Sequence, residues 1–249
     1  MAENDYIGSH GPADGTLDAR RTGEIDGWIK AKESSPGTIA AVWATRNTRA
    51  AIWDAMAARE SFVTSGPRIK VRFFSGADLD ASPTDARALV EQGYHGGVPM
   101  GGTITGLTKT PTFTVWASKD PDGANLDRIQ IIKGWVDAKG EPQDRVIDVA
   151  WSGDRKPGKD GKLPSVGNTV DVKQATYTNA IGSVELMGSW TDPTFDPKQH
   201  ALYYVRVLEI PTPRWTTYDA VRNNLPLLED VPTTIQERAW TSPIWYAPL

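Results

Sequence analysis

Strict alternation of apolar and polar residues is the feature that most constrains this chain. It recurs in five segments after residue 112, at Phe113/Val115/Ala117, Ile129/Ile131, Ile147/Val149/Trp151, Val184/Leu186 and Tyr203/Val205/Val207. A period of two places every second side chain on one face of a strand, so that face can be buried in a sheet. Asp-Pro, Asp-Gly and Gly-Lys turns lie between the segments. The pattern predicts a mainly β chain built as an antiparallel β-sandwich.

The segment before residue 65 has a different pattern. Ile39-Ala40-Ala41-Val42-Trp43 is a continuous apolar run, which is typical of a strand buried on both faces of a parallel sheet. Asn47 or Thr48 can cap a helix directly after it, and Ser61-Phe62-Val63-Thr64 resumes as a strand. The order predicts one residual β-helix-β unit ahead of the sandwich.

Two further elements are expected inside the sandwich, which we assign to residues 65–249. Ser82 as N-cap, Pro83 at the first helical position and Gly93 near the end predict one inserted helix. The segment 238–246 is expected to pair with the strand at 202–208 and to bury both of its tryptophans, Trp240 and Trp245.

Composition excludes several classes of function. The chain has 27 basic and 31 acidic residues and a net charge of −4, so it lacks the cationic field that binds nucleic acid. It contains no cysteine, which excludes disulfides, thiolate catalysis and Cys-ligated zinc. Its beginning, residues 1–6, is polar and does not resemble a signal peptide. No apolar run approaches the roughly 20 residues of a membrane-spanning helix. We therefore expect neither a nucleic-acid nor a membrane partner.

Several long strings resemble one bacterial family, "domain of unknown function 3604", over roughly residues 36–249. They are Thr64-Ser65-Gly66-Pro67-Arg68-Ile69, Ala117-Ser118-Lys119-Asp120-Pro121-Asp122-Gly123-Ala124-Asn125-Leu126-Asp127, Val149-Ala150-Trp151-Ser152-Gly153-Asp154-Arg155-Lys156 and Ile210-Pro211-Thr212-Pro213-Arg214-Trp215-Thr216-Thr217-Tyr218-Asp219-Ala220-Val221-Arg222. The resemblance implies longer, exported or periplasmic, hydrolase-like proteins related to the PHP class of metal-dependent phosphoesterases, in which a catalytic barrel precedes this region.

On that resemblance, residues 1–64 are the remnant of the end of an incomplete PHP-like α/β barrel, and residues 65–249 are an accessory domain. The partner would then be the missing upstream barrel or another chain that supplies it. The His-x-Asp-x-His pattern that opens a PHP metal site does not occur in this sequence. We accordingly expect no cofactor bound by this chain, with a divalent metal held by the parent protein.

Candidate binding residues are few. Of the three histidines, His10 in Gly8-Ser9-His10-Gly11 is the candidate metal ligand, and an exposed loop histidine is the alternative reading. Four arginines flank the junction near residue 65 and can hold a carboxylate or phosphate of a substrate, or form ion pairs instead: Arg46, Arg49, Arg68 and Arg72. The acidic stretch 120–127 offers oxygen ligands for calcium, or is a structural turn.

Three functions remain open. The first is a non-catalytic carboxyl-terminal accessory portion of a hydrolase-like protein. The second is part of a metal-dependent phosphoesterase-type hydrolase, working through His10 and the nearby arginines. The third is a carbohydrate- or ligand-binding sandwich, in which exposed tryptophans stack on sugar rings.

Overall fold

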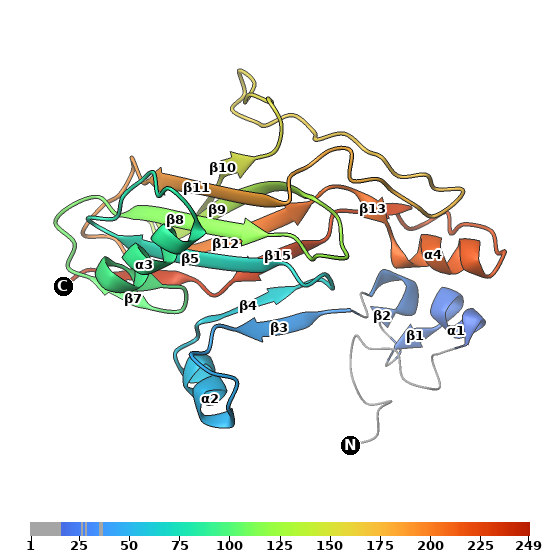
Figure 1. The fold of residues 1–249 in the computed structure, drawn as a ribbon, viewed down its shortest axis with the longest axis horizontal. Coiled ribbons are helices and arrows are strands. Elements are labelled where there is room, and N and C mark those ends of the chain that lie inside the picture. Colours follow the sequence, from blue (N-terminus) through green and yellow to red (C-terminus); the bar gives the residue numbers. More distant parts are fainter. Residues whose placement is uncertain (1–15, 26, 28, 35–36) are drawn as a thin grey trace.

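The structure is a computed structural model that describes residues 16–25, 27, 29–34 and 37–249 (Figure 1). The mainly β prediction is confirmed, because an eight-stranded and a four-stranded sheet carry most of the described chain. The larger sheet contains β3 (Ile39–Val42), β4 (Ser61–Thr64), β7 (Thr103–Thr105), β9 (Leu126–Val136), β10 (Pro142–Trp151), β12 (Ala201–Glu209), β15 (Arg238–Thr241) and β16 (Ile244–Ala247). The smaller sheet contains β5 (Lys70–Gly76), β6 (Val98–Pro99), β8 (Thr112–Ser118) and β11 (Glu185–Thr191).

Short elements complete the chain. Two two-stranded pairs are β1 (Glu24–Ile25) with β2 (Ile29–Lys30) and β13 (Thr212–Pro213) with β14 (Thr234–Ile235). The helices are α1 (Leu17–Thr22), the 3-10 helix η3 (Ala31–Glu33), α2 (Arg49–Ala57), α3 (Ala86–Gly96) and α4 (Trp215–Arg222). In the described part of the chain, no helix has the length and apolar character needed to cross a membrane.

One core joins the inner faces of the two sheets. Along β12 every second residue is buried, from Ala201 to Glu209, as the alternating pattern predicts. Val205 and Val207 of this strand belong to the same apolar cluster as Phe73 and Phe113 of the smaller sheet. The larger sheet runs in the order β10-β9-β12-β15-β4-β3, and its neighbouring strands are antiparallel along this path.

The end of the chain pairs with β12, as expected. Trp240 of β15 lies opposite Arg206, and Trp245 of β16 lies opposite Leu202. The predicted burial of both indoles is wrong, however, because this register directs them away from the shared core. Trp245 is 41% exposed and Trp240 is half-buried.

The inserted helix α3 is present, but its beginning differs from the prediction. Asp85 caps it by accepting a hydrogen bond from the Ala88 backbone N–H, whereas the sequence suggested Ser82. The helix continues past Gly93, since this glycine lies against the ring of Phe74 and leaves space for it. α3 thereby covers the outer face of the smaller sheet.

Residues 39–64 form a projection that we call the arm, made of β3, α2 and β4 (Figure 1). The predicted β-helix-β order is present, and Thr48 caps α2 as expected. The expected parallel, doubly buried strand is wrong, because β3 pairs antiparallel with β4 and Ile39 is exposed. The described strands close no barrel, and β4 continues the larger sheet by pairing with β15. The domain boundary at residue 64/65 stays a prediction.

Candidate functional site

Arg68 is held by the acidic turn that follows β8. Its Nε and Nη2 atoms lie 3.1 and 3.0 Å from the two carboxylate oxygens of Asp120, and Asp122 accepts a further bond. Burial alone would raise the pKa of Asp120, but the hydrogen bonds from Arg68 lower this pKa to about 2. The guanidinium charge is therefore neutralised within the protein, as in the ion-pair alternative.

The turn itself is organised around an ammonium group. Lys119 Nζ donates to the backbone carbonyls of Asp120, Pro121 and Gly123 at 2.7, 3.2 and 2.8 Å. These are hard oxygen ligands of the type that a calcium ion requires. Because a lysine already occupies them, the geometry favours the structural-turn alternative over a calcium loop.

Arg72 is engaged where the arm meets β5 and α3. Its guanidinium carbon lies 3.5 Å from the centre of the Trp43 ring, and Nη1 lies 3.2 Å from Glu60 Oε1. Nη1 also lies 2.5 Å from the Tyr94 hydroxyl, which donates to the same Glu60 carboxylate. Burial and the Glu60 bond raise the pKa of Tyr94 to about 12. This cluster fastens the arm to the two-sheet body.

The remaining predicted residues are not brought together. Arg46 and Arg49 are exposed on the arm, and the described part of the chain offers neither of them a salt bridge. His10 lies outside the described residues. Among the described residues, no group of three or more histidines and carboxylates is arranged to hold a metal ion.

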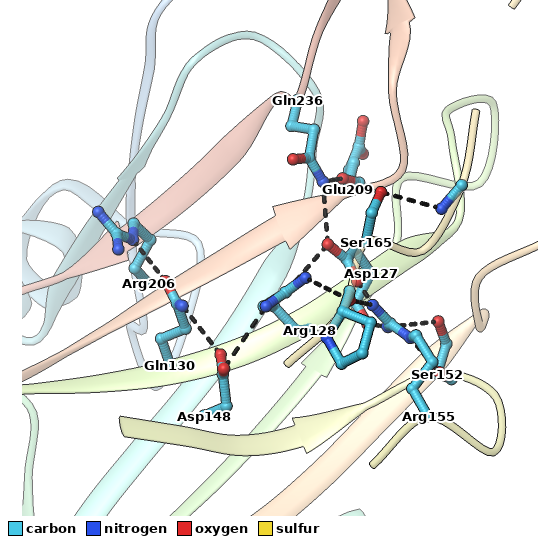
Figure 2. Close-up of polar contacts among 12 residues, drawn as sticks. Asp127, Arg128, Gln130, Asp148, Ser152, Arg155, Ser165, Arg206, Glu209 and Gln236 are labelled. Atoms are coloured by element: carbon cyan, nitrogen blue, oxygen red, sulfur yellow. Dashed lines mark hydrogen bonds and ion pairs between the residues drawn. The ribbon is translucent and has the colours of Figure 1, made fainter. Parts of the chain in front are cut away.

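A buried polar network lies at the beginning of β9 (Figure 2). The Asp127 carboxylate, which is 1% exposed, accepts bonds from Arg155 at 2.6 Å, Gln236 at 2.9 Å and Arg128 at 3.0 Å. Arg155 also donates to the carbonyl of Pro164 at 2.9 Å. The network ties the long segment between β10 and β11 to the sheet. Side-chain bonds thus hold in place a segment that has little secondary structure of its own.

Glu209 is a buried acidic residue that the sequence did not lead us to expect. It ends β12 on the inner face, is 2% exposed, and its Oε1 atom is buried with no hydrogen-bond partner in the described chain. Burial, followed by the charges of Glu237 and Asp120, raises its pKa to about 8, and the Lys119 ammonium opposes this shift. The alternation through Val205 and Val207 already placed it inward. Extending that pattern by one step would have found it.

A protonated carboxylic acid at neutral pH can act as a general acid when a substrate reaches it. Glu209, however, lies inside the sheet core and lines neither of the two surface grooves described below. Its immediate consequence is therefore for stability.

The first groove, of about 690 Å³, runs over the ends of β9, β12 and β16. Trp245 and Leu202 line it together with Val136, and His200 and Arg59 supply polar groups. Gly134 lies opposite Leu202 in the register. An exposed indole therefore lines this hollow, as Trp53 lines another on α2. The three aligned, exposed indoles expected of a sugar platform are not found in the described chain.

The second groove, of about 260 Å³, lies between the arm and the beginning of β5. One wall is formed by Ile39 and Ala41 of β3 and by Trp43, which directly follows this strand. Ile69 also lines the groove. Trp43 donates its indole N–H to the Val71 carbonyl at 2.8 Å. This groove separates two strands that are not paired with each other.

Comparison with known proteins gives one match. The family described as "Protein of unknown function (DUF3604)" matches residues 1–248. The match also covers residues 1–35, which the resemblance read from the sequence had left out. No curated protein and no solved structure matches the chain.

Proposed function

The chain belongs to the DUF3604 family, and on this premise we propose that it is a non-catalytic accessory β-sandwich that packs on a PHP-like hydrolase barrel. One observation carries the proposal. On α2 of the arm, Trp53 is 68% and Met56 55% exposed. Large apolar side chains grouped on a projecting element mark interaction surfaces. The barrel, with its divalent metal, would supply the chemistry.

The internal pairing of the polar groups supports this reading. Arg68 and Arg72, the two candidate anion-binding residues of the β5 region, are already neutralised by Asp120 and Glu60. Asp127 is surrounded by its own donors. Side chains that satisfy one another stabilise the body and offer little to a substrate.

The first test is catalytic. The purified chain is incubated with manganese, zinc or magnesium and p-nitrophenyl phosphate or its diesters. An accessory module gives no turnover above buffer. Metal-dependent turnover that co-purifies with the chain and disappears in a His10→Ala variant would establish the phosphoesterase alternative instead.

The second test is docking. The separately expressed barrel of a longer member of the family is titrated into the chain by calorimetry. Trp53→Ser should weaken binding roughly 30-fold, corresponding to about 2 kcal/mol for an indole at the centre of an interface. Val184→Ser is the matched control, because Val184 is 63% exposed just before β11. Equal binding by wild type and Trp53→Ser would remove the arm from the interface.

A second candidate function is favoured by the groove that contains Trp245. A hollow of this volume with an exposed indole and polar rim groups suits a small, partly apolar ligand such as a sugar. A glycan array on wild type and Trp245→Ala decides it. Binding that Trp245→Ala abolishes supports the ligand-binding sandwich, and a blank array on wild type dismisses it for sugars.

A further inference from the structure

The edge of the larger sheet at β3 is unpaired within the described chain, since β3 ends the strand order. The hydrogen bond from Trp43 N–H to the Glu60 carbonyl, at 3.0 Å, shows which residues of β3 direct their backbone groups toward β4. In an antiparallel pair, alternate residues direct both backbone groups to the same side. With Ala41 opposite Phe62, the N–H and C=O groups of Ala40 and Val42 therefore point away from β4. They are free to pair with another strand.

In the described part of the chain, this short edge carries no lysine, proline, bulge or covering segment that would block pairing. Edge strands are usually protected by a lysine, a proline, a bulge or a covering segment. The four residues of β3 are Ile, Ala, Ala and Val, and the register with β4 is continuous. Ile39, 37% exposed, and Val63, 40% exposed, add apolar surface around it.

The charges near this edge are mainly positive. Lys70, at the beginning of β5, lines the groove beneath β3 and is exposed, and Arg46 and Arg49 follow β3 along the chain. Glu60, the acidic group closest along β4, is neutralised by Arg72. A partner segment with acidic side chains complements this surface, whereas a second copy of the same edge would bring its own cations.

We propose that β3 binds an extended, acidic segment of a partner polypeptide, which adds a strand to the larger sheet. Backbone hydrogen bonds to Ala40 and Val42 would hold the segment, and the groove between β3 and β5 would receive its alternate side chains. The inference deepens the proposed function and rests on it, because it names the backbone contact by which the arm meets the barrel.

Proline substitution separates edge pairing from folding. Ala40→Pro removes one outward N–H and leaves the β3–β4 bonds intact, as proline is tolerated on edge strands with the N–H side in solvent. Ala40→Ser keeps the N–H and is the matched control. Ala41→Pro removes an N–H directed at β4. We expect it to lower the melting temperature, which would confirm that Ala41, and not Ala40, bonds to β4. The probe is the barrel of a longer family member, titrated by calorimetry.

We expect Ala40→Pro to weaken barrel binding at least tenfold with an unchanged melting temperature, and Ala40→Ser to bind like wild type. Lys70→Glu should weaken binding, and added salt should weaken it for wild type. Wild-type binding by Ala40→Pro, with Trp53→Ser still impaired, overturns strand addition while leaving the docking proposal in place. No binding by wild type overturns both. Self-association of wild type that Ala40→Pro abolishes assigns the edge to a second copy and overturns the acidic partner.

Discussion

Glu209→Gln should stabilise the protein at alkaline pH and leave it unchanged in acid. The native Glu209 carboxyl is buried on the inner face of β12, and its Oε1 atom has no hydrogen-bond partner in the described chain. Glutamine has nearly the same shape and stays neutral. Burial and the charges of Glu237 and Asp120 raise the pKa of Glu209, and a neutral amide at this position does not carry that cost.

The pKa difference sets the sign and the size of the effect. The folded pKa of about 8 lies above the ordinary value of 4.5, so the folded state keeps a proton that the unfolded state releases. Below pH 4.5 both states are protonated and the group contributes nothing. Between these two values the free energy of unfolding falls as pH rises, by about 5 kcal/mol in total at 1.36 kcal/mol for each pKa unit. Relaxation around an ionised Glu209 leaves a measurable part on the order of 2–4 kcal/mol.

Urea denaturation followed by tryptophan fluorescence checks the prediction at about pH 5 and about pH 8.5. The variant should match wild type at the lower pH and exceed it at the higher one, with the same m-value. Glu185→Gln, at an exposed position on β11, controls for the loss of a carboxylate. If the difference in free energy of unfolding between wild type and Glu209→Gln is the same at both pH values, Glu209 ionises normally and the reasoning from its burial is refuted.

Three more predictions follow from packing and pairing. Gly93→Ala should destabilise the protein by about 1–3 kcal/mol in thermal melts, because the added Cβ would lie 2.4 Å from the Phe74 ring; an unchanged melt means that α3 shifts freely. Asp127→Asn should cost about 3–5 kcal/mol in urea denaturation, since it leaves the Arg155 charge without its partner; a loss below about 1 kcal/mol would show the network to be dispensable. Deleting residues 239–249 removes most of β15 and all of β16. We therefore expect insoluble or molten protein by gel filtration and circular dichroism. An unchanged melting temperature would show that these strands do not contribute to the stability of the sheet.

The two-sheet body could be predicted from the sequence because it depends on local periodicity. Alternation from residue 113 to residue 208 determines which side chains face inward, and the pairing of β12 with the end of the chain agreed with expectation. The exposure of Trp245 could not be predicted. An indole is apolar enough for either face, and only the register opposite Leu202 decides which face it takes.

The arm was misread for a related reason. A run of small apolar residues is typical of a buried parallel strand, yet in the described chain β3 has one neighbour and lies at an edge. Burial of such a run can be completed within the chain or by a partner, and the sequence pattern is the same in both cases. The candidate site shows the same limit, because Arg68 and Arg72 were expected near the junction but their partners Asp120 and Tyr94 lie on distant segments.

The polar groups of the two-sheet body find partners within the chain, whereas the backbone groups at the edge of the arm do not. Lys133 of β9 is 3% exposed, but Asp192 accepts its charge at 2.6 Å, so the core satisfies it internally. Polar groups at the core are thus mostly completed by the chain's own residues, with Glu209 as an acid that can remain neutral. The backbone groups of β3 have no such completion in the described chain. Because Arg72 and Trp43 hold the arm firmly against β5, its open edge is presented in a fixed orientation, and a binding partner gives up little conformational entropy of the arm when it docks.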